Sequence, residues 1–349
     1  MKRKMWLSMA LSALLLVAAG CGNNSNNTEP SETPGTGSGE QAETTSYSIA
    51  FSQYVEHPSL DATREGILAA LKEAGISEED NTLSIDYNNA QGDPGNNLSI
   101  GQKLGNTKAD LVIAIATPSA QAVAENVKEK PILFAAVTDP LDSKLVNDLK
   151  QPGGNISGAS DTNPEATKQL MGFVSSHFPD VKTVGLIINE GEPNAVVMAR
   201  TAEEALSEHG IEMVKAAVTN TSEVKQAAES LVGKVDAFFI TLDNNVVSGV
   251  DTIIETAKAN QIPFFSSDRD TVEKGAFATV GFKYYDHGYQ VGQMAVEILK
   301  DGKNPGEMEI TVPDKLDLIL NLGAAADYGI EVTDAMKEEV KDPENNIIE

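Results

Sequence analysis

From Ser46 onward, short apolar runs rich in β-branched residues alternate with longer amphipathic stretches. This alternation is typical of α/β folds, in which helices cover both faces of a parallel sheet. Gly75 and Gly210 stand where two of the intervening helices should end. The predicted strands cover residues 48–52, 83–87, 111–116, 132–137, 184–189, 212–217, 237–241, 263–266 and 276–280. Because these runs are continuously apolar, we expect parallel strands that are buried on both faces.

The series of strands and helices occurs twice along the chain. It runs from Ser46 to Gly153-Gly154-Asn155 and starts again near residue 160. A chain of 349 residues is also about twice the length of one ordinary domain. We therefore predict two Rossmann-like α/β lobes with parallel sheets. Ligands of such folds meet the carboxyl ends of the strands, so we expect a ligand cleft between the lobes.

The N-terminus has the pattern of an export signal. Three basic residues at positions 2–4 precede an apolar run over residues 7–19, a length typical of secretory signals and short for a membrane span. The run ends in Val17-Ala18-Ala19-Gly20-Cys21, which resembles the lipobox of bacterial lipoproteins, although Ala18 stands where Leu is usual. We predict a signal peptide over residues 1–20 and lipidation of Cys21. The alternative is cleavage elsewhere, with Cys21 incidental.

Residues 22–45 contain almost no side chain that could be buried. Such a segment cannot recover the entropy of ordering its backbone. We predict that residues 21–45 are a lipid-bearing cysteine followed by a flexible tether, which would anchor the exported protein to the outer face of the bacterial cytoplasmic membrane.

Charge and composition argue against several classes of function. Asp and Glu outnumber Lys and Arg by 52 to 26, whereas nucleic-acid binding needs clustered basic residues. A single cysteine allows no internal disulfide and no Cys/His zinc cluster. The four histidines lack zinc-protease spacing, and there is no Gly-x-Ser-x-Gly motif. We predict no nucleic-acid partner, no metal, no cofactor and no enzymatic activity.

The tetrapeptide Thr117-Pro118-Ser119-Ala120 directly follows a predicted strand. Thr117 is predicted to cap the next helix, with Pro118 at its first position. The N–H groups of Ser119 and Ala120 would then be free to bind a carboxylate. The alternative is an ordinary capped helix with water on these amides.

Similar polar residues recur along the chain. They are Thr138-Asp139-Pro140 after the predicted strand at 132–137, Ser160-Asp161 at the boundary between the lobes, Asn163-Pro164, and Asp243-Asn244 after the predicted strand at 237–241. Each alone is usually a cap or a turn. Together, acidic and amide residues facing a carboxylate-binding helix end predict a site for a zwitterion.

Several strings of the chain resemble the substrate-binding lipoproteins of ABC importers, and more narrowly the branch that binds tryptophan, phenylalanine or tyrosine. These strings are Ser52-Gln53-Tyr54-Val55-Glu56-His57-Pro58-Ser59-Leu60-Asp61, Ala116-Thr117-Pro118-Ser119-Ala120-Gln121, Val137-Thr138-Asp139-Pro140, Pro152-Gly153-Gly154-Asn155-Ile156-Ser157-Gly158, Ser160-Asp161 and Leu242-Asp243-Asn244. The resemblance extends over residues 47 to about 340.

The resemblance implies a type I periplasmic-binding fold, in which three crossing segments join two lobes that close around one ligand. The first lobe would hold residues 46–159 and about 282–315, and the second lobe 160–281 and about 316–349. The implied function is capture of an aromatic amino acid and its delivery to an ABC permease with its ATPase. The alternatives are a two-lobed ligand sensor, or a binding protein for another small solute such as a sugar or a nucleoside.

The resemblance also implies roles for individual residues. It places the ligand carboxylate at Thr117, Ser119 and Ala120 with Thr138 nearby, the ammonium at Asp161 and Asp243, and further contacts at Asn194, Asn244, Gln53 and Tyr54. The string around Asn194 departs from the family pattern, because the family often has Asn followed by Ser there. His57 has two equal interpretations, a ligand contact or a loop histidine that bonds to backbone.

Overall fold

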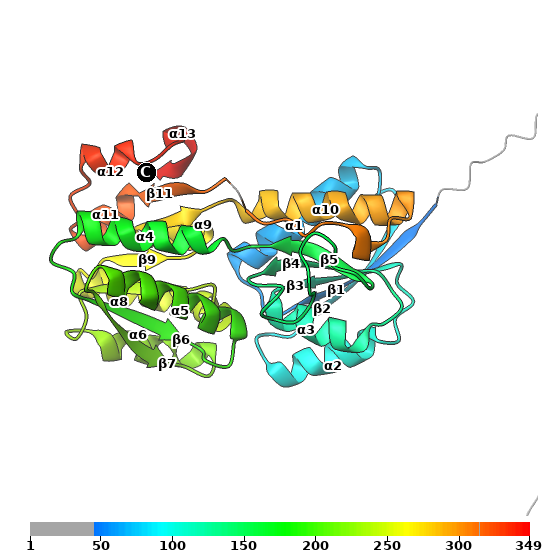
Figure 1. Ribbon diagram of the computed structural model, residues 1–349, viewed down its shortest axis with the longest axis horizontal. Helices are drawn as coiled ribbons and strands as arrows, with labels where there is room; N and C mark the ends of the chain where they lie inside the picture. Colours follow the sequence, from blue (N-terminus) through cyan, green and yellow to red (C-terminus); the bar gives the residue numbers. More distant parts are fainter. Residues whose placement is uncertain (1–44, 314) are drawn as a thin grey trace, which may run out of the picture. The chain divides into compact units, whose positions relative to one another are not determined.

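The computed structural model describes residues 45–313 and 315–349. The predicted signal peptide, Cys21 and all of the predicted tether except Thr45 lie outside the described residues. The part of the chain that the structure describes holds two α/β sheets, one five-stranded and one seven-stranded (Figure 1). Within this part, no helix is both long and apolar enough to cross a membrane.

The five-stranded sheet and its helices form what we call the first lobe. Its strands are all parallel and lie in the order β2-β1-β3-β4-β5. Helices α1 and α10 lie together on one face of this sheet, and α2 and α3 lie together on the other (Figure 1). The elements are β1 (Tyr47–Gln53), α1 (Pro58–Glu73), β2 (Leu83–Asn89), α2 (Pro94–Leu104), β3 (Leu111–Ile115), α3 (Thr117–Asn126), β4 (Ile132–Val137), β5 (Ile156–Ser160), α10 (Tyr284–Asp301) and the short η2 (Pro305–Glu307).

The seven-stranded sheet and its helices form the second lobe. The strand order is β12-β11-β10-β9-β8-β6-β7, and the pairing is parallel except between β10 and β11. The elements are α4 (Pro164–His177), β6 (Thr183–Ile188), α5 (Pro193–Glu208), β7 (Glu212–Ala217), η1 (Thr221–Glu223), α6 (Val224–Leu231), β8 (Ala237–Ile240), α7 (Asn244–Ser248), α8 (Val250–Asn260), β9 (Phe264–Ser266), α9 (Arg269–Lys274), β10 (Ala278–Gly281), β11 (Asp317–Asn321), α11 (Leu322–Tyr328), α12 (Asp334–Glu338), α13 (Pro343–Asn346) and β12 (Ile347–Ile348).

The chain passes between the two sheets three times. It leaves the first sheet after β5, returns to it after β10 so that α10 packs on α1, and enters the second sheet again at β11. Thr311, on the last passage, forms a parallel bridge with Ala159. The residue boundaries predicted for the lobes stay a prediction.

The predicted strands agree with the observed ones to within about two residues, and the exceptions have physical reasons. The sequence Ile156–Ser160 of β5 is ISGAS, which lacks the β-branched run used to find the others. Strand β11 was also missed, and it runs antiparallel to β10. Strands β2 and β7 lie at sheet edges and therefore expose residues, whereas β3 and β4 are buried throughout.

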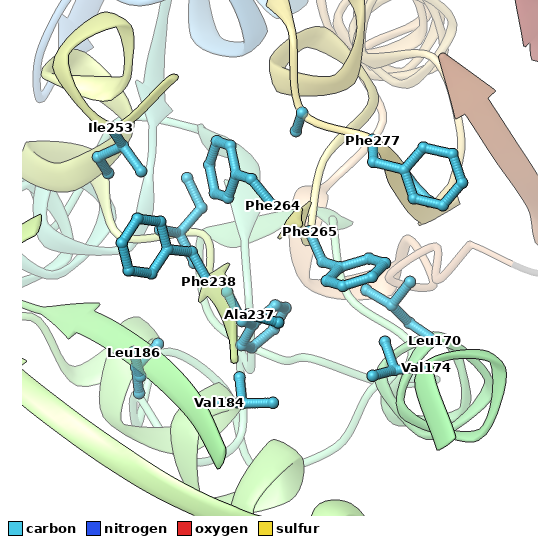
Figure 2. Packing of buried hydrophobic residues seen from close by; sticks show 14 of the residues in the cluster. Leu170, Val174, Val184, Leu186, Ala237, Phe238, Ile253, Phe264, Phe265 and Phe277 are labelled. Atoms are coloured by element: carbon cyan, nitrogen blue, oxygen red, sulfur yellow. The ribbon is translucent and has the colours of Figure 1, made fainter. Parts of the chain in front are cut away.

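The apolar periodicity builds the cores in layers. In β3, Leu111, Ile113 and Ile115 face the α1 and α10 side, and Val112 and Ala114 face the other side. In the second lobe, phenylalanine rings from β8, β9 and the approach to β10 fill the space between sheet and helices (Figure 2). The rings of Phe265 and Phe277 meet edge to face, with centroids 5.9 Å apart.

Helices α1 and α10 pack at very short distance because glycines line their contact. A Cβ on Gly288 would lie 1.9 Å from the Thr63 carbonyl oxygen, and one on Gly66 would lie 2.1 Å from the Tyr285 oxygen. Both obstacles are backbone atoms, which cannot rotate away. The contact fixes the start of α10, where the chain has just returned from the second lobe.

We expect Gly288→Ala to destabilise the protein by about 1–3 kcal/mol or more, because the added methyl group must push α1 and α10 apart. The matched control is Gly172→Ala in α4, where a Cβ meets nothing within 4 Å. That change should be neutral or stabilising by up to about 1 kcal/mol, since alanine favours a helix. Urea unfolding of both variants measures the difference. Equal stability of the two variants would contradict the close packing.

Candidate functional site

A small cavity lies where the carboxyl ends of strands from both sheets meet the loop after β1 and the start of α10. Its walls come from both lobes. The lining residues are His57, Ser59, Leu60, Ala136, Thr138, Asp161, Asn194, Leu242, Asn244, Val247, Asp268 and Tyr284. Four of the predicted site residues are therefore brought together here: Thr138, Asp161, Asn194 and Asn244.

Asp161 follows β5 directly and is 6% exposed. Its carboxylate accepts hydrogen bonds from the Thr162 hydroxyl at 3.0 Å and the Tyr284 hydroxyl at 3.1 Å. Burial nevertheless raises the pKa of Asp161 to about 6. A carboxylate held in this place gains from a cationic partner, because a partner offsets the cost of desolvation.

Asp268 is a second buried carboxylate in the wall, and sequence reasoning missed it. It caps α9 by accepting the Thr271 N–H at 2.8 Å, and it also accepts the Ser266 hydroxyl at 2.9 Å. The Ser59 hydroxyl of α1 donates to it at 3.1 Å, which links the two lobes. Nearby, burial and the charge of Asp268 raise the pKa of Asp270 to about 7. The available signal was an acidic residue just after a predicted strand, the pattern that singled out Asp243.

Glu192, at the start of α5, is the centre of a buried hydrogen-bond network. It is 1% exposed, and burial raises its pKa. One carboxylate oxygen, Oε2, accepts the Asn244 N–H at 3.0 Å, the Asn244 amide Nδ2, and the Asn194 Nδ2 at 3.2 Å. The other, Oε1, accepts the Asn245 N–H at 3.0 Å and its Nδ2 at 3.1 Å. Sequence reasoning did not predict Glu192.

The two asparagines of the wall differ in whether their side-chain oxygens have a hydrogen-bond partner. The Asn194 Nδ2 also donates to the Leu242 carbonyl at 2.7 Å, while its buried Oδ1 has no hydrogen-bond partner among the described residues. The Asn244 Oδ1 lies 3.5 Å from the Nε2 of His57. The Nδ1 of His57 is likewise buried without a partner in residues 45–313 and 315–349, and burial lowers the pKa of this histidine.

Asp243 lies behind the wall instead of in it. Its carboxylate accepts the N–H of Asn189 and, at 3.1 Å, the N–H of Val246, so it caps α7 and ties α7 to the end of β6. It is fully buried, and burial together with the charge of Glu192 raises its pKa well above the ordinary value. Both carboxylate oxygens of Asp243 therefore accept hydrogen bonds from backbone N–H groups.

Helix α3 starts differently from the prediction. Its cap is Ala116, with φ of 80°, so Thr117 is the first helical residue and the prediction that it is the cap was wrong. The Ala120 N–H donates to the Ala116 carbonyl at 3.0 Å, so the prediction that this N–H is free was also wrong. The reason is that the turn at Ala116 begins the helix one residue early. The Thr117 Oγ1 accepts the Thr138 N–H at 3.2 Å, and the Ser119 hydroxyl donates to Asn97 at 3.2 Å.

Gln53 and Tyr54 end β1 and support the loop that follows. The Gln53 Nε2 donates to the Val55 carbonyl at 3.0 Å and to Asp61 at 2.8 Å. The Tyr54 hydroxyl donates to the Gly92 carbonyl at 3.1 Å, and burial raises its pKa to about 12. Neither residue is among those that line the cavity, and nor are Thr117, Ser119 and Ala120. Contact of these five residues with a ligand stays a prediction.

The cavity wall at Ala136 is shaped by a histidine of α10. Strand β4 has an irregular register against β5 between Phe134 and Val137, and Ala136 there has φ of 54°. The Ala136 N–H donates to the Nε2 of His287 at 3.0 Å. Because Nε2 accepts this bond, the ring is neutral, and burial lowers its pKa to about 4. The hydrogen bond from Ala136 to His287 thus stabilises the irregular backbone of β4 in the wall of the cavity.

A second small cavity adjoins the first, because the two share Asp161, Leu242, Asp268 and Tyr284. Apolar side chains form one part of its remaining wall: Ala166, Leu170, Met198, Val280, Phe282 and Leu316. The polar residues Thr162, Asn163, Thr167, Ser267 and Arg269 form the other part.

The described residues contain no group of three or more His, Cys, Asp or Glu side chains placed to hold a metal ion. The arrangement at the cavity instead provides hydrogen-bond acceptors and carboxylates, which suit a positively charged organic group.

Known proteins share this sequence and this fold. Residues 48–342 match the family described as ABC transporter substrate binding protein. A tyrosine-binding protein of Clostridioides difficile (strain R20291) is 37% identical over 323 residues, which cover 92% of this chain and 91% of that protein.

Two solved structures are similar over most of their length. A structure from Streptococcus pneumonia in complex with L-Trp has 31% identity and a TM-score of 0.80, covering 87% of this chain and 100% of that one. The ligand-free, open structure of a substrate binding protein with adhesive properties from Clostridium difficile has 36% identity and a TM-score of 0.62, covering 86% and 98%. The backbone is thus more similar to the ligand-bound structure, although the identity is lower.

The resemblance seen in the sequence is confirmed by these comparisons, and so is the predicted fold class of two α/β lobes with mostly parallel strands. The chain belongs to the family of ABC transporter substrate-binding proteins and has their type I periplasmic-binding fold.

Proposed function

We propose that this protein captures an aromatic amino acid, tryptophan, phenylalanine or tyrosine, and delivers it to an ABC permease with its ATPase. The observation that carries the proposal is the charge of the cavity. Two buried carboxylates, Asp161 and Asp268, line it, and no Lys or Arg is among the described residues that do so. A ligand that brings its own positive charge complements such a wall.

The ammonium group of the ligand is proposed to lie at Asp161 and Asp268, with the amide oxygens of Asn194 and Asn244 nearby. Asp268 takes the place that the sequence suggested for Asp243, since both oxygens of Asp243 already bond to backbone N–H groups. Pairing with the ammonium would offset the free-energy cost of burying the charged carboxylate of Asp161.

The ligand carboxylate is proposed to lie on the first-lobe side, beside Thr138. In neutral His57 the proton lies on Nε2, because Nε2 faces the acceptor oxygen of Asn244; Nδ1, which has no partner among the described residues, is therefore an acceptor and does not bind the carboxylate. Thr117 supports this position from behind, because its hydroxyl oxygen holds the Thr138 N–H. Ser119 and Ala120 then belong to the support of the site.

The aromatic ring is proposed to enter the adjoining cavity, where Leu170, Met198 and Phe282 would contact it. Burying a ring against apolar side chains gains free energy in proportion to the area removed from water. A tyrosine-binding relative and a structure solved with L-Trp support an aromatic amino acid as the ligand.

A calorimetric screen of the twenty amino acids tests the proposal. At least one of L-tryptophan, L-tyrosine and L-phenylalanine should bind, and leucine should bind more weakly. Asp161→Asn should weaken that binding by about 2–5 kcal/mol, because the ammonium loses a buried charged partner. Silence for all three aromatic amino acids would refute the proposal, and binding of a sugar or a nucleoside alone would favour the alternative solute.

Asp139→Asn is the matched control, since it removes the same charge near the same edge of the sheet. Asp139 only holds a turn, by accepting the N–H groups of Leu141 and Asp142. The wild type should also lose affinity as the pH falls below about 6, by up to about tenfold for each pH unit, because Asp161 must release a proton to pair with an ammonium. Asp161→Asn should lack that part of the pH dependence.

The export of the protein and its anchoring through Cys21 are also proposed, on the sequence of the N-terminus. Cys21→Ala should prevent lipidation and release a ligand-competent protein from the membrane fraction. Ser25→Ala, in the same segment, should leave the protein anchored. Fractionation with immunoblotting measures both, and a Cys21→Ala protein that stays in the detergent-extractable fraction would contradict the assignment.

A further inference from the structure

We infer that Glu192 is a positioning residue that fixes the amide of Asn194 with its oxygen left for the ligand, so that the site selects an amino group over a hydroxyl group. The inference rests on the proposed function and names the source of its specificity. Neither Glu192 nor this form of selection was predicted from the sequence.

The first step is the number of donors that Glu192 holds. Five hydrogen bonds converge on one buried carboxylate, two from backbone N–H groups at the start of α7 and three from the side-chain amides of Asn194, Asn244 and Asn245. An ionised carboxylate is acceptor-only, so all five donors can be satisfied at once. A neutral glutamine has one acceptor oxygen and adds two N–H donors.

The second step is the direction of the amides. A side-chain amide has one donor end and one acceptor end, so fixing Nδ2 fixes Oδ1 as well. Both hydrogens of the Asn194 Nδ2 are used, on Glu192 and on the Leu242 carbonyl, and its Oδ1 is buried without a partner among the described residues. The Asn244 Nδ2 is also held by Glu192, and the Asn244 Oδ1 faces the Nε2 of His57 at 3.5 Å. Both asparagines line the cavity. The acceptor that this network leaves for a ligand is therefore the Asn194 Oδ1.

The third step is the chemistry that this oxygen and the buried carboxylates recognise. An ammonium group carries three N–H donors and can satisfy Asp161, Asp268 and the Asn194 oxygen together. The hydroxyl of the corresponding hydroxy acid has one donor and would leave buried acceptors unpaired. A site built to bond a polar group rejects an analogue that cannot make those bonds.

The test is Glu192→Gln, measured by calorimetry and competition with four probes. These are L-tyrosine, L-tryptophan, and their hydroxy-acid analogues 3-(4-hydroxyphenyl)lactate and indole-3-lactate. In the variant, the glutamine N–H groups oppose the asparagine Nδ2 groups and turn an amide over. The ratio of amino-acid affinity to hydroxy-acid affinity should fall by about tenfold or more relative to the wild type. Glu190→Gln, two residues away and exposed, should leave the ratio unchanged.

The ratio separates positioning from mere support. If Glu192 only stabilised the fold, both classes of probe would lose affinity equally and the ratio would stay constant, which would overturn the inference. Asn194→Ala, which removes one acceptor directly, should lower the same ratio, and it decides the question if Glu192→Gln does not fold. A wild type that binds none of tyrosine, tryptophan and phenylalanine would overturn the proposed function itself, whereas unchanged ratios in a protein that binds the amino-acid probes would overturn only the role of Glu192.

Discussion

Buried carboxylates that have no basic partner among residues 45–313 and 315–349 are the constraint on which this site depends. Asp161, Asp268 and Glu192 are each less than 9% exposed, yet they are held by hydroxyls, amides and helix N-terminal N–H groups instead of Lys or Arg. Such donors satisfy the oxygens geometrically but do not neutralise the charge. The negative potential is therefore left for whatever occupies the cavity.

The fold can hold these carboxylates because the parallel strands of each sheet have their carboxyl ends at the same edge of that sheet. Asp161 follows β5 and Asp268 follows β9, while Glu192 stands just before α5. The helices that start at these edges supply backbone N–H donors. Helix α10 adds side-chain hydrogen bonds. Its first turns contribute Tyr284, which bonds to Asp161, and His287, which bonds to the bend at Ala136. The glycine-lined contact with α1 fixes α10 in this position.

The sequence was sufficient for the fold class and for most strands, because buried parallel strands are runs of β-branched and apolar residues. It was insufficient for β5, whose small residues carry no such signal, and for the exact start of α3, which a positive φ at Ala116 decides. Four of the predicted ligand residues line the cavity. Thr138 and Asn244 follow predicted strands, which is a signal that local sequence carries, whereas Asn194 was expected only from the family resemblance.

That Asp268 lines the cavity and Asp243 does not shows what local sequence does not carry. Both residues follow a strand and both cap the next helix, so their patterns are the same. Only the tertiary arrangement decides that Asp243 turns back to the Asn189 N–H while Asp268 faces Ser59 of the other lobe. Glu192 was missed for a related reason, because its donors are brought together from α5 and α7, 52 residues apart.

The hydrogen bonds between the two lobes lie in the wall of the cavity. His57 and Ser59 of the first lobe reach Asn244 and Asp268 of the second, and all four residues line the cavity. A molecule bound among them touches both lobes, so it binds better to the form in which these contacts exist. By linkage, that difference in affinity is the free energy with which a ligand favours contact between the lobes. The charge that selects the ligand and the contacts that join the lobes thus involve the same residue, Asp268.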